Sequence, residues 1–216
     1  MRLKDGLTRL FGEFSIEPDS DPVRKLQIYL ALLEKWNPRV NLTANTTWNA
    51  LEPLFREGIW AALKYPCDHR THLDIGSGAG FPALILRAFK TEMELELVES
   101  RRKKGAFLET AAWEMGLTGT RVHTKRLNDL LTTCESGRTW DCVSWKAIRI
   151  AGGDLLRLRE HTTEKTRFWM FHGKEAAVED ARTLDAEFIL NDKQPVPGQK
   201  GSFLSIYKIR NPECFT

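Results

Sequence analysis

The most informative part of the chain reads His72-Leu73-Asp74-Ile75-Gly76-Ser77-Gly78-Ala79-Gly80-Phe81-Pro82. A short apolar run ends in an acid, three glycines alternate with other residues, and Phe-Pro opens an amphipathic segment. Glycine allows the backbone to turn tightly or to approach a ligand closely, and proline suits the first turn of a helix. The stretch therefore predicts a strand, a glycine loop and a helix, which together form the first βα turn of a nucleotide-binding sheet.

The glycine spacing separates two classes of cofactor. The dinucleotide fingerprint is G-x-G-x-x-G, and here Gly76 and Gly78 match it, whereas the third position is Phe81 and Gly80 comes one residue early. Asp74 would attract a cationic ammonium and sulfonium and would repel a pyrophosphate. We therefore expect S-adenosylmethionine (SAM) rather than NAD. A glycine-rich turn without any cofactor is the alternative.

Composition places the chain among globular proteins. At 216 residues, with 42% hydrophobic and 28% charged residues, it can bury one substantial core with a small appended segment. No apolar run approaches membrane-spanning length, and the charged N-terminus lacks the pattern of a signal peptide. The four cysteines, Cys67, Cys134, Cys142 and Cys214, have no CxxC spacing. We expect reduced thiols in a cytoplasmic, monomeric protein without a metal site or membrane contact.

Basic residues are unevenly distributed, although the net charge is only +3. One run reads Arg101-Arg102-Lys103-Lys104, and further cations are Lys125, Arg126, Lys146, Arg149, Arg157 and Arg159. If these residues share a face with the cofactor, they would attract a polyanion. A solvated surface without a partner is the simpler explanation for each of them alone.

Residues 1–64 carry three amphipathic patterns at helical spacing. The second predicted helix has Asp21 as its cap and Pro22 at its first position, and it ends at Asn37-Pro38, because the residue before proline avoids helical geometry. We interpret the three helices as a cap or lid on a methyltransferase domain of residues 65–216. Packing against the core without a further role fits the same periodicity.

From about residue 70, predicted strands alternate with helices, which implies a largely parallel sheet. The strands are expected to end at Asp74 and to lie at 94–98, around Val122, and at 140–144, 167–171, 186–190 and 203–209. The expected fold class is α/β, a Rossmann-like class I SAM-dependent methyltransferase. Its seven-stranded, mostly parallel sheet would end in a C-terminal antiparallel hairpin and carry an N-terminal helical extension.

Polar residues at the carboxyl ends of these strands are candidates for the site, because open α/β sheets bind ligands at that edge. Glu99 follows the second strand, where a carboxylate commonly binds ribose hydroxyls. After the third strand, Asn128 is the first candidate for the adenine edge and Asp129 the second. Lys146 follows the fourth strand, close to where cofactor and substrate must meet.

The absence of several motifs limits the kinds of methyl transfer that the sequence supports. The sequence has neither the Asp/Asn-Pro-Pro-Tyr/Phe element common in amine methylation nor a convincing Lys/Asp/Lys/Glu set for ribose methylation. Cys142 lies within a predicted strand, where it suits a buried hydrophobe better than a nucleophile. Transfer to an atom with a free lone pair, such as N7 of guanine, remains, and it requires orientation but no general base. Lys146 and Arg126 are candidates for holding phosphates or the guanine edge.

Three stretches resemble the RsmG (GidB) family of methyltransferases. Leu73–Pro82 is similar to its LD-[IV]-G-[ST]-G-x-G-F-P signature, and Leu97–Ser100 with Lys103-Lys104 is similar to the segment after its second strand. Lys35–Asn37 with Asn41–Thr43 resembles its W-N-x(3)-N-L-T element. The resemblance implies N7 methylation of a guanine in small-subunit ribosomal RNA, with SAM as the methyl donor.

The resemblance also implies roles for individual residues. These are Gly76, Ser77, Gly78 and Phe81 for the methionine end of SAM, Glu99 for the ribose, Leu127 and Asn128 for the adenine, and Lys146 with Arg126 for the RNA. Together with Asp74 and Gly80 of the glycine loop, they form the complete set of predicted site residues.

The chain departs from the family pattern on its substrate face. Arg56-Glu57 and Trp60-Ala61 stand where the family usually has Arg-His and Asp-Ser, Trp145-Lys146-Ala147 where it has Ser-Arg-Ala, and His172-Gly173 where it has Lys-Gly. Lysine keeps the charge of arginine but loses its planar, two-pronged donor. Three alternatives stay open: a methyltransferase of this fold with another acceptor (RNA, protein or small molecule), a non-catalytic RNA-binding relative, and a nicotinamide oxidoreductase, against which the missing third glycine argues.

Overall fold

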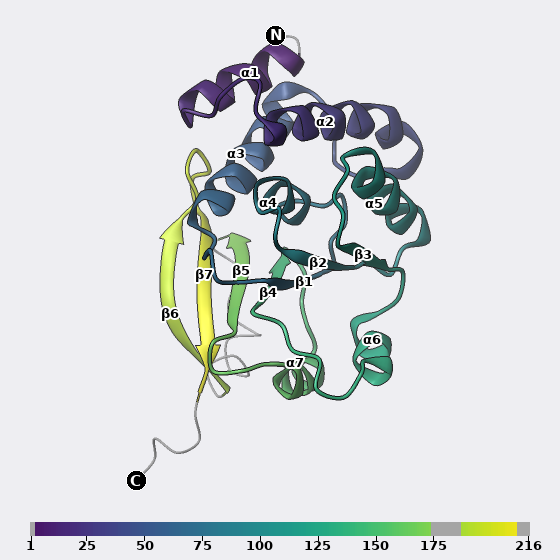
Figure 1. Cartoon of the computed structure of the whole chain (residues 1–216), viewed down its shortest axis with the longest axis vertical. Coiled ribbons are helices and arrows are strands. Elements are labelled where there is room, and N and C mark those ends of the chain that lie inside the picture. Colours follow the sequence, from purple (N-terminus) through teal and green to yellow (C-terminus); the bar gives the residue numbers. More distant parts are fainter. Residues whose placement is uncertain (1–2, 174–186, 211–216) are drawn as a thin grey trace.

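The computed structural model describes residues 3–173 and 187–210, which contain one seven-stranded sheet with helices on both faces (Figure 1). The strands are β1 (Thr71–Ile75), β2 (Glu94–Val98), β3 (Thr120–His123), β4 (Cys142–Lys146), β5 (Arg167–Gly173), β6 (Phe188–Pro195) and β7 (Ser202–Ile209). Their order is β3-β2-β1-β4-β5-β7-β6, in which the first five are parallel and β7 is antiparallel to both of its neighbours. The predicted fold class is confirmed, including the C-terminal hairpin.

Alternating side chains of the strands supply two separate cores. Leu73 and Ile75 of β1 belong to one core, and Leu95 and Leu97 of β2 belong to the core on the opposite face. The helices are α1 (Leu3–Glu13), α2 (Asp21–Val40), α3 (Trp48–Lys64), α4 (Ala83–Phe89), α5 (Arg102–Glu114), α6 (Leu127–Thr133) and α7 (Gly152–Leu158), followed by a short 3-10 helix (Arg159–His161). Helices α4 and α5 cover the face of Leu95 and Leu97, and α6 and α7 cover the other face.

Helices α1 and α2 lie outside α4 and α5, whereas α3 descends beside α4 toward the sheet (Figure 1). Helix α2 packs against α4 and α5, and α3 packs against α4. The apolar side chains of all five helices belong to the same core. The division of the chain at residue 64 therefore stays an interpretation, because the N-terminal helices and the sheet share this core.

Helix α2 does not keep the predicted ends. Ser20, in extended conformation, precedes the first helical residue Asp21, and the helix continues through Pro38. Asn41 ends it in the left-handed conformation, with φ 55°, and its N–H donates to Asn37 O at 2.9 Å. Proline disfavours helical geometry in the residue before it but does not forbid it, and Asn37 remains in the helix.

The starts of two strands and one helix also differ from the prediction. Strand β4 begins two residues later than expected, so that Lys146 is its last residue and Trp140 lies outside it. Helix α6 was not predicted at all, and the candidate Asn128 is its second residue. The predicted sixth strand began near Ala186, which lies outside the described residues, and β6 itself begins at Phe188.

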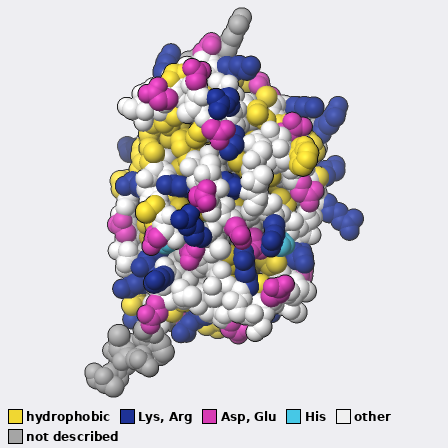
Figure 2. Space-filling model, in the orientation of Figure 1, with side chains coloured by type: hydrophobic (Ala, Val, Ile, Leu, Met, Phe, Trp, Pro, Cys, Tyr) yellow, Lys and Arg dark blue, Asp and Glu magenta, His cyan; other side chains and the backbone are white. Residues whose placement is uncertain are grey.

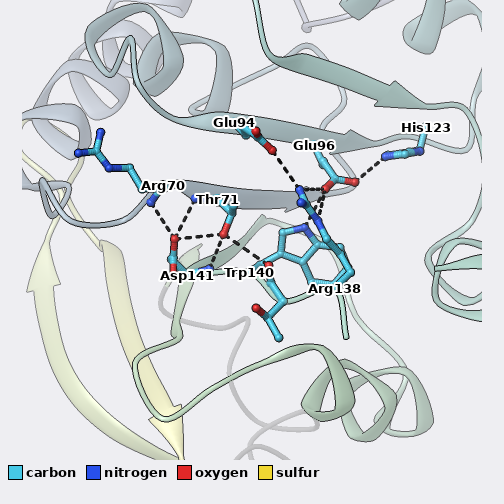
Figure 3. A network of polar contacts seen from close by, with 9 residues as sticks. Arg70, Thr71, Glu94, Glu96, His123, Arg138, Trp140 and Asp141 are labelled. Carbon is cyan, nitrogen blue, oxygen red and sulfur yellow. Dashed lines mark hydrogen bonds and ion pairs between the residues drawn. The ribbon is translucent and has the colours of Figure 1, made fainter. Parts of the chain in front are cut away.

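A polar network around β2 was not visible in the sequence (Figure 3). Glu96, in the middle of β2, accepts hydrogen bonds from Arg138 Nη2 at 2.6 Å and from Trp140 Nε1 at 3.1 Å, and His123 Nε2 lies 2.8 Å from its other oxygen. Burial by itself would raise the pKa of Glu96, but these donors outweigh it and lower the pKa to about 2. The network connects Arg138 and Trp140, in the segment before β4, to β2 and thereby stabilises the fold.

None of the helices in the described part of the chain combines the length and apolar character needed to cross a membrane. Within the same residues, no three His, Cys, Asp or Glu side chains are grouped as metal ligands would be. Cys67, Cys134 and Cys142 are free thiols, and Cys142 is buried in β4. Cys214 lies outside the described residues.

Candidate active site

The glycine loop leaves the carboxyl end of β1 and turns over the end of β2. The N–H groups of Gly76 and Ser77 donate to Val98 O at 2.8 and 3.1 Å. Gly76 and Gly78 have φ values of 68° and 58°, a region that glycine enters without steric penalty. A Cβ on Gly76 would lie 2.7 Å from Ile148 Cδ1. The loop backbone therefore packs directly against the segment that follows β4.

Glu99, directly after β2, fixes the other side of this loop. Its Oε2 accepts a hydrogen bond from Gly78 N at 2.9 Å, and its Oε1 accepts one from Arg101 N at 2.8 Å. The residue is only 7% exposed. Because a carboxylate offers about four lone-pair sites, Glu99 keeps acceptor capacity for the hydroxyl groups of a ligand.

A cavity of about 520 Å³ opens between the glycine loop and the segments that precede α6 and α7. This volume falls within the range of roughly 300–1,000 Å³ that is typical of small-molecule sites. Its apolar lining consists of Ile75, Val98, Leu127, Ile148 and Ile150. The remaining lining residues are Gly76, Gly78, Glu99, Ser100, Arg101, Lys104, Lys125, Arg126, Arg149, Ala151 and Asp154.

Four of the predicted cofactor residues line this cavity, namely Gly76, Gly78, Glu99 and Leu127. The predicted substrate residue Arg126 lines it as well. The structure thus brings together the glycine loop, the carboxylate after β2 and the start of α6, as the sequence predicts for a ligand that spans the ends of β1, β2 and β3.

The other predicted cofactor residues do not line the cavity. Asp74 and Ser77 are buried beneath the loop, where Ser77 Oγ donates to the main-chain oxygen of Asp74 at 2.9 Å. Gly80 and Phe81 face inward, and the Phe81 ring lies 5.2 Å from the ring of Tyr29. Asn128 is exposed on α6, and its Oδ1 accepts a hydrogen bond from Arg157 of α7.

Asp74 forms a buried chain with Ser144 and His72. Ser144 Oγ donates to Asp74 Oδ1 at 2.6 Å, and His72 Nε2 lies 2.7 Å from the same hydroxyl. Burial raises the pKa of Asp74 to about 7 and lowers the pKa of His72 to about 3. His72 is therefore neutral at neutral pH, and its Nε2–H is left to donate to Ser144. A cation bound above the loop would favour the ionised form of Asp74.

Helix α2 holds the glycine loop from behind. The buried Tyr29 hydroxyl donates to Ala79 O at 2.6 Å. Burial raises the pKa of Tyr29 well above its usual range, so the hydroxyl keeps the proton that it donates. Among the described residues, all those that line the cavity lie between positions 75 and 154. The N-terminal helices therefore support the loop, and none of their described residues lines the cavity.

Lys146 lies beside the cavity lining without being part of it. Its ammonium is 2.5 Å from Oε1 of Glu57, on α3. The Glu57 side chain is 2% exposed and that of Lys146 is 24% exposed. Gln199, in the turn between β6 and β7, donates to the other oxygen of Glu57 at 3.2 Å. The three side chains join α3, the end of β4 and the C-terminal hairpin.

Cations gather around the cavity, as the sequence predicts if they share a face with the cofactor. Those that line it are Arg101, Lys104, Lys125, Arg126 and Arg149. Glu99 and Asp154 are the acids of the lining, so the charge of the wall is positive. Such a wall attracts a polyanion. Arg157 and Arg159 lie elsewhere, in contact with Asn128 and Glu187.

The segment after β4 contributes residues that sequence reasoning missed. Ala147 has a φ of 52°, which is uncommon outside glycine, and this turn is followed by Ile148, Ile150 and Asp154 in the cavity wall. The signal available in the sequence was two isoleucines flanking Arg149 at the carboxyl end of a strand, where ligands bind in open α/β sheets.

Solved structures share this fold. A ribosomal protein L11 methylase from Lactobacillus delbrueckii subsp. bulgaricus matches with a TM-score of 0.57 at 12% identity, over 72% of this chain and 77% of that chain. A variant of MtNAS in complex with S-adenosylmethionine matches with a TM-score of 0.58 at 14% identity, over 87% and 75% of the two chains. At these identities the likeness is one of fold.

Relatives in sequence are more specific. Ribosomal RNA small subunit methyltransferase G of Paracoccus denitrificans is 27% identical over 195 residues, which cover 89% of this chain and 98% of the relative. The protein of the same name from Roseiflexus sp. (strain RS-1) is 31% identical over 182 residues, which cover 84% and 75%. The family model described as rRNA small subunit methyltransferase G (GidB) matches residues 22–200. The resemblance seen in the sequence is confirmed, and the chain belongs to this family of methyltransferases.

Proposed function

We propose that this protein transfers the methyl group of SAM to N7 of a guanine in 16S ribosomal RNA. The observation that carries the proposal is one cavity in which a glycine loop and Glu99 meet five cations. Membership of the rRNA small subunit methyltransferase G family supports the same assignment. Because N7 already has a free lone pair, the residues need only align the acceptor, and alignment can supply much of the rate.

Residues in and beneath the cavity wall offer a partner to each part of SAM. The open backbone at Gly76 and Gly78 would accept its methionine end, Glu99 would accept the ribose hydroxyls, and Leu127 would offer an apolar surface to the adenine. Asp74, beneath the loop, would stabilise the cationic ammonium and sulfonium. When bound, SAM supplies an electrophilic methyl group.

The buried members of the predicted set would act on the loop rather than on the ligand. Ser77 fixes the start of the loop through its bond to the backbone of Asp74, and Gly80 and Phe81 pack its end against the core. Asn128 is the member with the least support, because Arg157 already donates to its side-chain oxygen. We propose that Asn128 contacts the adenine edge after its side chain has exchanged Arg157 for the adenine as its hydrogen-bond partner.

The cations of the cavity wall would hold the RNA. Arg126 is exposed at the rim, next to Lys125, and would bind phosphates around the target guanine. Lys146 is held by Glu57, but its ammonium has three donors and Glu57 uses one of them. Lys146 would therefore donate to the acceptor base without removing a proton from it.

The test is transfer of labelled methyl from SAM to purified small ribosomal subunits that lack the modification, mapped by cleavage at N7-methylguanine. We expect a single modified guanine. A variant with Glu99→Gln keeps the size of the side chain, and we expect it to lose most of its affinity for SAM in calorimetry. Normal SAM binding by wild type without any transfer would contradict the proposed acceptor.

A second function is favoured by one observation. Glu57 and Lys146, both at positions where the chain departs from the family pattern, are joined in an ion pair. A face rebuilt in this way suits a methyltransferase with a changed acceptor, and SAM binding without transfer to small subunits would support it. Cytoplasmic location and a monomeric state stay predictions from the sequence.

A further inference from the structure

A second cavity lies apart from the active site, in a groove between α2 and α5. It has a volume of about 340 Å³. Helix α2 contributes Lys35, Trp36 and Arg39, and the first turn of α5 contributes Lys103. Leu32 and Val40 of α2 supply apolar lining, and Thr110 and Glu114 of α5 complete it. We call this cavity the α2–α5 groove.

The cations of the α2–α5 groove are available to a ligand. Lys35, Arg39 and Lys103 are all exposed. Within residues 3–173 and 187–210, no ion pair joins any of the three to a carboxylate. Lys and Arg side chains also project from the side of the molecule where α2 ends and α5 lies (Figure 2). The groove lining thus holds three cations against one acid, Glu114, and this excess of positive charge beside an apolar surface fits an anionic partner that also has apolar faces.

Trp36 supplies such a surface. Its indole ring is half-buried and meets the ring of the buried Phe107 at 5.8 Å and an angle of 65°, which fixes its orientation. The ring also lines the groove, and a fixed aromatic side chain between cations is the arrangement on which single-stranded nucleic acids stack their bases. RNA combines phosphates with aromatic bases and matches both features.

The groove and the active-site cavity are separate, but both have lining residues in the first turn of α5. Lys104 lines the active-site cavity, and its neighbour Lys103 lines the α2–α5 groove. Arg101, directly before the helix, also belongs to the active-site cavity. The first turn of α5 therefore carries positive charge from one cavity to the other, and an RNA strand in the active site can extend along it.

We propose that the α2–α5 groove binds a single-stranded segment of the RNA substrate beside the target guanine. Phosphates of this segment contact Lys35, Arg39 and Lys103, and one base lies against Trp36. The inference rests on the proposed function and adds to it a binding site remote from the methyl group. This site contributes to the affinity and orientation of the RNA and not to the binding of SAM.

The experiment measures the affinity of the protein for small ribosomal subunits and for protein-free 16S ribosomal RNA as a function of salt. The main variant carries Lys35→Gln, Arg39→Gln and Lys103→Gln, all at exposed positions. We expect binding weaker by about tenfold or more at physiological salt, and a plot of log K against log salt whose slope is reduced by roughly 2, because each phosphate contact contributes about 0.7–0.9 to the slope. The KM for RNA should rise while SAM affinity stays at the wild-type value.

Two further variants keep the test decisive. Lys165→Gln removes an exposed cation from the turn before β5, and we expect it to leave the salt slope unchanged. Trp36→Leu keeps an apolar side chain over Phe107 but removes the stacking surface, and we expect weaker RNA binding by about fivefold or more, because stacking on an aromatic residue contributes about 1–3 kcal/mol per base. Intact SAM binding by each variant shows that it is folded.

The outcomes separate this inference from the proposed function. If wild type methylates small subunits and the triple variant keeps the wild-type slope and KM, the groove does not bind RNA although the proposed function holds. If the triple variant loses affinity for assembled subunits but not for protein-free RNA, the groove contacts a ribosomal protein and the inference is wrong. If wild type transfers no methyl group, the salt slopes still show whether the groove binds RNA.

Discussion

The ammonium of Lys146 lies 2.5 Å from the carboxylate of Glu57, and this pair connects the end of β4 to helix α3. In the sequence, the two residues stand as separate departures from the family pattern on the expected substrate face. The pair explains why a carboxylate is tolerated at a position that is 2% exposed, because a buried charge requires a partner. It also means that neither residue can be replaced without consequence for the other.

The two single variants of this pair should differ in stability. Lys146→Met leaves the Glu57 carboxylate buried with Gln199 as its one remaining side-chain donor among the described residues, and we expect a loss of about 3 kcal/mol in the free energy of unfolding. Glu57→Gln leaves an ammonium that can reach solvent, so we expect a smaller loss of about 1 kcal/mol. The double variant should be more stable than Lys146→Met alone. Chemical denaturation measures all three, and strictly additive losses would show that the pair is not coupled.

Asp74 should make stability depend on pH. Its pKa is about 7 in the folded protein and is ordinarily 3.8, so between these values the folded state holds a proton that the unfolded state has lost. This contribution to stability is full below pH 3.8 and is lost as the pH rises to about 7. Asp74→Asn removes the buried charge, and we expect the variant to be more stable than wild type by about 4 kcal/mol at pH 8 and by little at pH 4. SAM affinity should fall because the negative charge is gone.

Asp141, directly before β4, provides a control because its pKa is shifted in the opposite direction to that of Asp74. Burial alone would raise its pKa, but hydrogen bonds from the N–H groups of Arg70 and Thr71 outweigh burial and lower it. Asp141→Asn should therefore destabilise the protein at pH 7, by less as the pH falls, and leave SAM affinity unchanged. His72, whose pKa is lowered to about 3, adds a pH dependence of its own at acid pH, so wild type and variants are compared at each pH. If the free energies of unfolding of Asp74→Asn and wild type differ by the same amount at every pH, the Asp74 carboxyl does not take up a proton on folding.

The parts of the site that the sequence predicted are those set by local chemistry. The glycine loop follows from the need for positive φ at Gly76 and Gly78, and Glu99 follows from its place at the end of a strand. The contacts that it did not predict join distant positions. Lys146 and Glu57 are 89 residues apart, and Arg138 and Glu96 are 42 apart. Such pairs depend on how helices and strands pack, which no spacing along the chain encodes.

Asn128 shows a second reason for a difference between sequence and structure. We predicted a loop after β3, in which a polar side chain would be free to meet the adenine. A short helix, α6, forms there instead and buries Leu127, Leu130 and Leu131. The helical turn directs Asn128 to the outer surface, where Arg157 of α7 donates to it. Of the two residues predicted for the adenine, Leu127 therefore lines the cavity and Asn128 does not.

Tyr29 should couple the N-terminal helices to the cofactor site. Tyr29→Phe removes only the hydroxyl group that donates to Ala79 O, and it keeps the ring in contact with Phe81. We expect a loss of about 1–2 kcal/mol in the free energy of unfolding, because a buried carbonyl is left without its donor. SAM affinity should also fall several-fold as the loop loses its support. Thermal denaturation and calorimetry measure the two effects, and unchanged SAM affinity in a destabilised variant would show that Tyr29 serves the core alone.

Gly78 and Gly116 form a matched pair for testing the glycine loop. Their φ values are 58° and 63°, and Gly116 lies after α5, with nothing within 4 Å of an added Cβ. An added Cβ at Gly78 would likewise be no closer than 3.7 Å to any heavy atom, so both Ala variants should lose stability by the same amount, about 1–2 kcal/mol for a left-handed alanine. Only Gly78→Ala should lose SAM affinity, by about tenfold or more, because Gly78 lines the cavity and its N–H holds Glu99, so that strain in this backbone acts on the ligand site. Equal SAM affinities in the two variants, measured by calorimetry, would place the ligand away from the loop and would contradict the cofactor site proposed for this cavity.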